Sequence, residues 1–162
     1  MDRFYSVAEH CILMSRWLEE ALAYSQKTSD EVRVLALEAL LHDATEAYVV
    51  DVPSPLKRFL SSYQDYEAGV AVAIAERFGH QKIDVTYKHG ESWIARVVEA
   101  PEVKSADSRI LLDERAALMS RHPLVWGVDS LKPLGVKVNG WDSQIVEQLY
   151  LERLEELGVL LQ

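Results

Sequence analysis

The chain has 162 residues, a formal net charge of -9 and one cysteine. This length fits one domain with its own core, so we expect a single domain over residues 1–162. One cysteine excludes an internal disulfide and favours a reducing, cytoplasmic location, and no apolar run is long enough for a membrane span. The acidic balance argues against binding a nucleic acid polymer, because that affinity rests on Lys and Arg that neutralise phosphates.

Helical periodicity recurs along the chain, whereas the alternation typical of strands scarcely appears. We therefore predict an all-α fold. Residues 80–90 show no clear period and are interpreted as a loop, and residues 122–141, with two prolines and three glycines, as an ordered excursion. Helices are expected at residues 6–24, from the capping box at 28–31 to about 49, at 63–78, near 92, at 102–121 and at 142–157.

Helix boundaries are marked by local signals. Ser6 followed by Glu9, and Thr28 followed by Glu31, are capping-box patterns that predict helix starts. Gly79 is a plausible stop for the helix before it. Proline at 53 and 55 should prevent the second helix from continuing.

A histidine and two carboxylates occur near the end of the second predicted helix. The run Val32–Leu41 before them is apolar almost all round, the pattern of an interior helix, and charged groups there are costly unless something compensates them. Residues three and four apart on a helix are neighbours, so His42, Asp43 and Glu46 should share one side. We expect an ion between His42 and Asp43, with Glu46 free to handle water.

Two further inward residues could complete the shell of such an ion. His10 lies between Val7 and Met14 on the first helix, and Asp107 lies beside Ile110 on a later one. Taken singly, an inward histidine is more often a hydrogen-bonded core residue than a ligand, and an inward carboxylate often caps a helix or pairs with arginine. Four such residues on three helices are hard to satisfy separately, whereas one divalent cation would satisfy all of them.

Two imidazoles and two carboxylates form a mixed site that suits manganese, iron, cobalt, nickel or zinc better than magnesium. An octahedral ion would keep two open positions, from which it polarises a phosphoryl oxygen and lowers the pKa of bound water. Glu46 could then act as a general base toward that water. For a small anionic ligand, Arg3, Lys57, Arg58 and Arg109 are candidate cations.

Two of these cations can also be explained by an ordinary structural role instead of ligand binding. Lys57 can equally be a solvated lysine on an exposed turn. Arg109 precedes Asp113 by four residues, which is salt-bridge spacing on a helix, and this pairing is slightly favoured over phosphate binding.

Short motifs follow one another along nearly the whole chain. They are Ser6-Val7-Ala8-Glu9-His10, His42-Asp43-Ala44-Thr45-Glu46, Asp51-Val52-Pro53-Ser54-Pro55 with Lys57, Val103-Lys104-Ser105-Ala106-Asp107, and Glu114-Arg115. This ordered set resembles the HD-domain metal-dependent phosphohydrolases, above all their 5'-deoxynucleotidase branch and the related phage and bacterial proteins that include deoxyadenosine triphosphate triphosphohydrolases. An isolated His-Asp pair would carry no weight, but the ordered set is highly specific.

The resemblance implies a helical bundle of the HD-domain type, with about five to seven helices. Glu46 would carry the water chemistry, and Asp51 would help to place the substrate or leaving group. Many relatives hold the phosphate and sense the sugar with an arginine and an aromatic residue ahead of the first motif, where this chain has Arg3, Phe4 and Tyr5. The resemblance also implies one divalent ion, held by His10, His42, Asp43 and Asp107.

The leading interpretation is a 5'-deoxynucleotidase that converts a deoxynucleoside monophosphate into the deoxynucleoside and phosphate. The alternative is a deoxynucleoside triphosphate triphosphohydrolase, but few clustered cations and a net charge of -9 favour monophosphates. A non-catalytic nucleotide-binding helical module is the rival from another class, and the presence of Glu46 argues against it. Hydrolysis of a signalling nucleotide is a further rival, against which the Asp51-x-Pro-x-Pro extension argues.

The expected partners are a small nucleotide substrate and a second copy of the chain, with no membrane. A homo-oligomer, a dimer first, is what the resemblance implies. The last predicted helix and the residues after it, 145–161, carry many apolar side chains, which either cover an interface with a second copy or complete the core.

Overall fold

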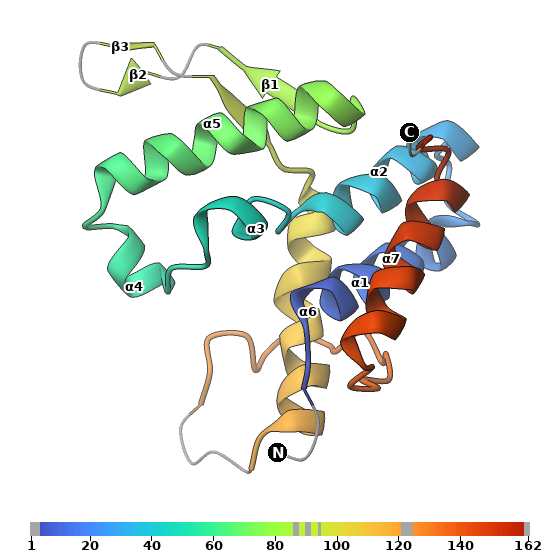
Figure 1. The fold of residues 1–162 in the computed structure, drawn as a ribbon. Helices are drawn as coiled ribbons and strands as arrows, with labels where there is room; N and C mark the ends of the chain where they lie inside the picture. Colours follow the sequence, from blue (N-terminus) through green and yellow to red (C-terminus); the bar gives the residue numbers. More distant parts are fainter. Residues whose placement is uncertain (1–3, 86–87, 90–91, 94, 121–124, 161–162) are drawn as a thin grey trace. The chain divides into compact units, whose positions relative to one another are not determined.

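The structure, a computed structural model, describes residues 4–85, 88–89, 92–93, 95–120 and 125–160. That part of the chain is mostly helical (Figure 1), which confirms the predicted class, while the HD-domain assignment stays a prediction. The helices are α1 (Val7–Leu22), α2 (Ser29–Leu41), α3 (Glu46–Val49), α4 (Ser54–Lys57), α5 (Ser61–Phe78), α6 (Pro101–Leu118) and α7 (Ser143–Glu156). Four short strands are β1 (Lys82–Asp84), β2 (Lys88–His89), β3 (Ser92–Trp93) and β4 (Arg96–Val98).

The residues cluster into two compact units. Unit 1 comprises Met1–Leu40 and Ala100–Gln162, and unit 2 comprises Leu41–Glu99. The prediction of one functional domain over the whole chain is not tested by this clustering and stays a prediction.

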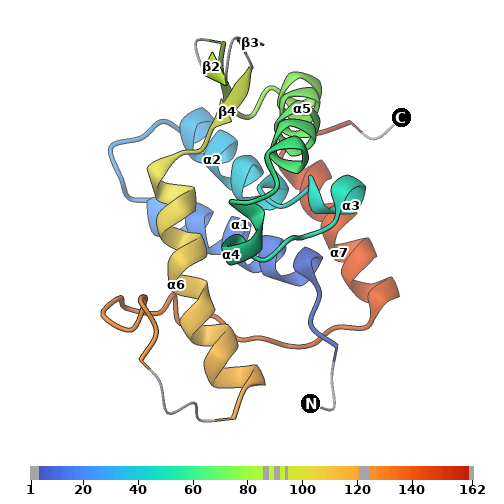
Figure 2. The ribbon, with the colours of Figure 1, turned by 90° about the vertical axis from the view of Figure 1, so that its left-hand side faces the viewer.

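Unit 1 is built around α1, which packs against both α6 and α7 (Figures 1 and 2). Apolar side chains recur on one face of α1 and of α6, so the two helices bury these faces together with α2. Burial of this kind is the main favourable term in folding. The resulting core contains Met14 and Leu18 of α1, Leu35 and Ala39 of α2, and Val103, Ala106 and Ile110 of α6.

Both predicted capping patterns lie at helix starts, but only one is reciprocal. The Thr28 hydroxyl accepts the Glu31 N–H at 3.2 Å, and the Glu31 carboxylate accepts the Thr28 N–H at 2.7 Å. The Ser6 hydroxyl accepts the Glu9 N–H at 3.1 Å, yet the Glu9 side chain does not complete the box. Instead, Glu9 is fully buried and accepts the N–H groups of residues 139–141 at 2.6, 3.1 and 2.9 Å. One carboxylate thereby anchors the segment between α6 and α7 (orange in Figure 2).

The second predicted helix ends early. α2 stops at Leu41, and residues 42–45 form turns in which the N–H groups of Ala44 and Glu46 bond to carbonyls three residues earlier, both at 3.0 Å. This segment contains Asp and Thr, whose side chains compete for backbone groups and disfavour helix interiors. The prediction of one continuous helix through Glu46 is therefore wrong, but the turn still brings His42, Asp43 and Glu46 to one side, where they line the same pocket.

Unit 2 contains the strands that sequence patterns did not predict. α5 packs against β1, β4, α3 and α4. β1 pairs antiparallel with β4, so that Ile83 lies opposite Val97, and β2 pairs with β3. The helix expected near residue 92 is therefore wrong, because pairing between β1 and β4 decides the conformation of short aliphatic segments that have no clear period of their own. The next helix, α6, begins at Pro101, where proline is well accommodated.

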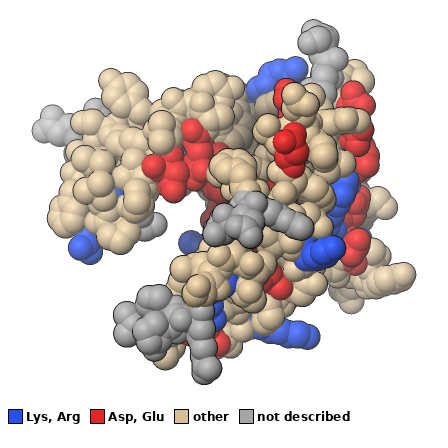
Figure 3. All heavy atoms as spheres, turned by 60° about the horizontal axis from the view of Figure 1, so that its bottom comes forward, with Lys and Arg blue, Asp and Glu red and all other residues tan. Residues whose placement is uncertain are grey.

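The surface reflects the acidic composition. On the face drawn in Figure 3, Asp and Glu side chains gather in patches with Lys and Arg between them, as expected for a net charge of -9. Among the described residues, no helix combines the length and hydropathy that crossing a membrane requires.

Candidate metal centre

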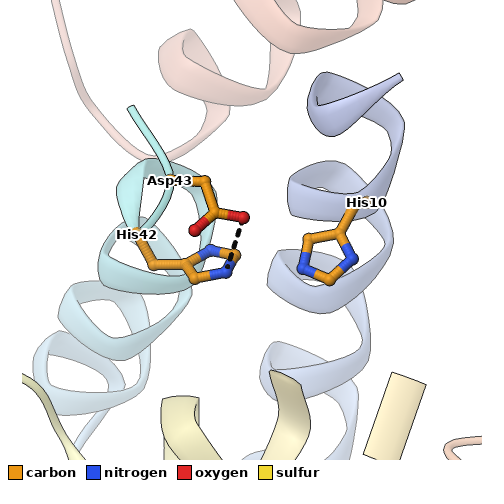
Figure 4. A group of neighbouring side chains, drawn as sticks. All are labelled: His10, His42 and Asp43. Carbon is orange, nitrogen blue, oxygen red and sulfur yellow. Dashed lines mark ion pairs between the residues drawn. The ribbon is translucent and has the colours of Figure 1, made fainter. Parts of the chain in front are cut away.

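Three of the four predicted ligands carry donor atoms that could hold a metal ion. His10 stands on α1 in unit 1, and His42 and Asp43 stand in the turn that follows α2, in unit 2 (Figure 4). His42 Nε2 lies 3.1 Å from Asp43 Oδ2. Two imidazole nitrogens and a carboxylate oxygen suit a transition metal or zinc.

Asp107, the fourth predicted ligand, lies beside His10 within unit 1. Its Oδ1 is 3.6 Å from His10 Nε2. The role of Asp107 as a ligand stays a prediction.

The other nitrogen of His10 is occupied by a carboxylate. Glu114 Oε1 lies 2.5 Å from His10 Nδ1, and the Tyr5 hydroxyl donates to the same oxygen at 2.7 Å. Burial and the hydrogen bond to Glu114 raise the pKa of Tyr5, so its hydroxyl keeps the proton that it donates. Sequence reasoning gave Glu114 no role, although it follows Asp107 by seven residues and so lies on the same side of α6.

Glu46, the predicted general base, is the first residue of α3. Burial, followed by the negative charges of Asp43 and Asp51, raises the pKa of Glu46 to about 7. A carboxyl group that titrates near neutral pH is suited to exchange protons with water at that pH. Asp51 itself is exposed in the segment between α3 and α4, and its role in placing substrate stays a prediction.

A pocket of about 430 Å³ opens within unit 2, where His42, Asp43 and Glu46 form part of its wall. This volume falls in the range of small-molecule sites, about 300–1,000 Å³. Two cationic residues, Lys57 of α4 and Arg96 of β4, belong to its lining. The full lining is His42, Asp43, Thr45, Glu46, Lys57, Gln64, Glu67, Ala68, Ala71, Arg96 and Val97.

Sequence reasoning missed Arg96. It lies 39 positions after Lys57, in a segment expected to be helical. A single arginine outside any motif does not indicate a binding role. Only the pairing of β4 with β1 and its packing on α5 bring Arg96 to the pocket.

Lys57 lies in the pocket wall and forms an ion pair. Its Nζ is 2.7 Å from Glu67 Oε1 and 5.7 Å from the centre of the Tyr63 ring. Burial opposes the charged form, but the hydrogen bond and the charge of Glu67 outweigh it and raise the pKa of Lys57. Lys57 is thus a cation held in place by Glu67, and its contact with a phosphate stays a prediction.

Arg109 holds a segment of the backbone. Its Nε donates to the carbonyl of Lys132 at 2.7 Å, and its guanidinium lies 4.7 Å from the centre of the Trp17 ring. The carboxylate of Asp113 accepts the N–H groups of residues 134–135, so the favoured Arg109–Asp113 ion pair is wrong. The prediction that Arg109 binds substrate stays untested, and Arg3 lies outside the described residues.

A strained residue precedes Asp51. Val50 has φ 64° and ψ 154°, a region populated almost entirely by glycine. The Tyr63 hydroxyl donates to the Val50 carbonyl at 2.5 Å, which ties this strained backbone to α5. Such strain occurs preferentially at functional sites, and here it lies between two predicted catalytic residues, Glu46 and Asp51.

Comparison with known proteins finds no family model that matches the chain. Among curated proteins, the uncharacterized protein YfdR of Escherichia coli (strain K12) is 39% identical over 79 residues. The matched part is 49% of this chain and 37% of YfdR, so it spans little more than a third of that relative. The name of YfdR states no activity.

Proposed function

We propose that the protein is a metal-dependent phosphohydrolase of the HD-domain type that acts on deoxynucleotides, as a 5'-deoxynucleotidase. The observation that carries the proposal is the pocket of unit 2, which His42 and Asp43 line together with Glu46. A metal site alone is compatible with many roles. A metal site beside a carboxyl group whose pKa is about 7 is suited to activating water.

Each residue has a role in this proposal. A divalent ion, when bound, would polarise a phosphoryl oxygen of the substrate and lower the pKa of a bound water. Glu46, half-buried in the pocket wall, removes a proton from the attacking water. Asp51 places the leaving group, and the side chains of Lys57 and Arg96 contact the anionic part of the substrate from the pocket wall.

The charges of the pocket favour a monophosphate over a triphosphate. Its lining contains two cations, Lys57 and Arg96, but also the carboxylates of Asp43, Glu46 and Glu67. Lys57 is moreover already paired with Glu67. A triphosphate brings several negative charges and needs a denser set of cations than this lining offers.

The proposal is tested by measuring products from a panel of ribo- and deoxynucleoside mono- and triphosphates with manganese or cobalt. We expect phosphate release from deoxynucleoside monophosphates. Triphosphate release from deoxynucleoside triphosphates would replace the nucleotidase by the triphosphohydrolase. Nucleotide binding without release of either product would establish the non-catalytic module, and turnover restricted to a guanosine tetraphosphate would establish the signalling-nucleotide hydrolase.

Substitution of Glu46 separates catalysis from metal binding. We expect Glu46→Gln to keep the metal and to lower kcat by roughly 100-fold or more, the usual contribution of a general base. His42→Ala should lose the metal as well. Glu76→Gln, an exposed carboxylate on α5, is the matched control and should leave both unchanged. Normal turnover in Glu46→Gln would remove Glu46 from the mechanism.

A further inference from the structure

We infer that Glu114 is a positioning residue, which fixes the ring orientation and the tautomer of His10 so that Nε2 is the nitrogen offered to a metal. The inference rests on the metal centre of the proposed function. The three side chains that carry it, Tyr5, His10 and Glu114, all belong to unit 1.

Hydrogen-bond chemistry decides the tautomer. Two groups, the Tyr5 hydroxyl and His10 Nδ1, lie 2.7 and 2.5 Å from the same oxygen, Glu114 Oε1. The hydroxyl donates to this oxygen, so the oxygen acts as an acceptor there. When the Glu114 carboxylate is ionised, this short contact places a proton on the facing nitrogen, because two lone pairs at that separation would repel. We therefore assign to the neutral form of His10 the tautomer with its proton on Nδ1 and its lone pair on Nε2.

The orientation of the ring is restrained together with its protonation. Only 9% of the His10 side chain and 14% of the Glu114 side chain are exposed, so water competes weakly for this hydrogen bond. Nε2 points to the side where Asp107 Oδ1 lies, at 3.6 Å. A carboxylate that accepts the second N–H of a metal-binding histidine raises the basicity of the ligand and fixes its direction.

A purely structural role is the alternative, since the same contacts join α1 to α6 across 104 positions of the sequence. The two roles differ in what they change. A structural tie affects the free energy of unfolding, whereas a positioning role changes the tautomer of His10 and the affinity for a metal in protein that is fully folded. Loss of such a partner typically weakens metal affinity by about 10–100-fold.

The test uses ¹⁵N-labelled protein and Zn²⁺ alone as the probe. Long-range ¹H–¹⁵N spectra assign the protonated nitrogen of His10, and titration gives the Kd for Zn²⁺. We expect wild type to be protonated on Nδ1 and to bind Zn²⁺ through Nε2. Glu114→Ala should raise the Kd about 10–100-fold and lose the preference for Nδ1–H, while Glu114→Gln, whose amide oxygen still accepts, should restore most of both.

Controls and contrary outcomes are distinct from those of the proposed function. Glu102→Gln removes a carboxylate elsewhere on α6, where it pairs with Lys27, and should change neither readout. Coordination of Zn²⁺ through Nδ1, or an unchanged Kd in folded Glu114→Ala, would overturn the inference. If wild type binds no Zn²⁺, a proton on Nε2 alone in the metal-free protein still overturns it. Expected spectra and affinities without any phosphate release would defeat the proposed function and leave Glu114 in its role.

Discussion

Unit 1 and unit 2 bury very different amounts of apolar surface. Among the described residues, nearly all buried hydrophobic side chains belong to unit 1, and unit 2 contributes Leu41 and Ala75. Unit 2 instead exposes large side chains such as Tyr48, Phe59 and Tyr66. Because burial of apolar surface is the main source of stability, unit 1 should carry most of the free energy of folding.

The residues of the proposed site have correspondingly different surroundings in the two units. His10 stands on α1, in the well-packed unit, and is held by Glu114. The pocket with Glu46, Lys57 and Arg96 lies entirely in unit 2, where few apolar contacts are buried. Regions of low local stability are those that rearrange around ligands.

The sharpest test of this comparison is truncation of matched side chains. Ile110 of α6 is 0% exposed and Leu56 of α4 is 53% exposed. Ile110→Ala should lower the free energy of unfolding by about 3–4 kcal/mol, since it removes buried methyl groups and leaves a cavity. Leu56→Ala should cost less than about 1 kcal/mol, because little burial is lost. Urea denaturation measures the free energy of unfolding of both variants. Equal losses would contradict the conclusion that unit 1 carries most of the stability.

Substitution of Glu9 tests whether buried polar contacts also contribute to the stability of unit 1. Its buried carboxylate accepts three backbone N–H groups of residues 139–141. Glu9→Gln replaces one acceptor oxygen by an NH₂ group that faces these donors, and should cost about 2–3 kcal/mol. Glu20→Gln, an exposed carboxylate on the same helix, is the control and should be neutral within about 0.5 kcal/mol. Chemical denaturation compares the two, and similar values would show that Glu9 contributes little.

His80 makes unit 2 sensitive to acid. It is 2% exposed, and burial lowers the pKa of its imidazole from 6.5 to about 4. Because the unfolded chain takes up the proton first, stability is full above pH 6.5 and falls as the pH drops toward 4. Between pH 7 and 5 the loss should be about 2 kcal/mol. His80→Leu should lack this loss when unfolding is measured at both pH values, and an equal loss in the variant would exclude His80 as its source.

Backbone strain gives the smallest expected effect and the opposite sign. Val50 has φ 64°, and its side chain is exposed, so Val50→Gly relieves strain and removes little burial. We expect a gain of about 1 kcal/mol in the free energy of unfolding. Gly135 has φ 82° and open space around it, so Gly135→Ala should lose about 1 kcal/mol for the same reason. Thermal melting measures both changes. A destabilised Val50→Gly would mean that the contacts of the Val50 side chain contribute more to stability than the backbone strain costs.

Local signals located most helix boundaries. Ser6 caps α1 and Gly79 ends α5 in a left-handed conformation, as their positions in the sequence predict. These signals work because a cap satisfies backbone groups within a few residues of itself. The turn at residues 42–45 and the strands between 82 and 98 had no comparably strong signal, and the predictions there were wrong.

The residues that could bind a metal were recognisable from the sequence alone, since His and Asp within apolar helical patterns are unusual whatever the fold. The sequence therefore determined the mostly helical class and nominated His10, His42 and Asp43. Only the tertiary structure decided their surroundings, because partners such as Glu114 for His10, Arg96 for the pocket and residues 139–141 for Glu9 lie far away along the chain. Contacts over such distances depend on helix packing and strand pairing, which no local pattern encodes.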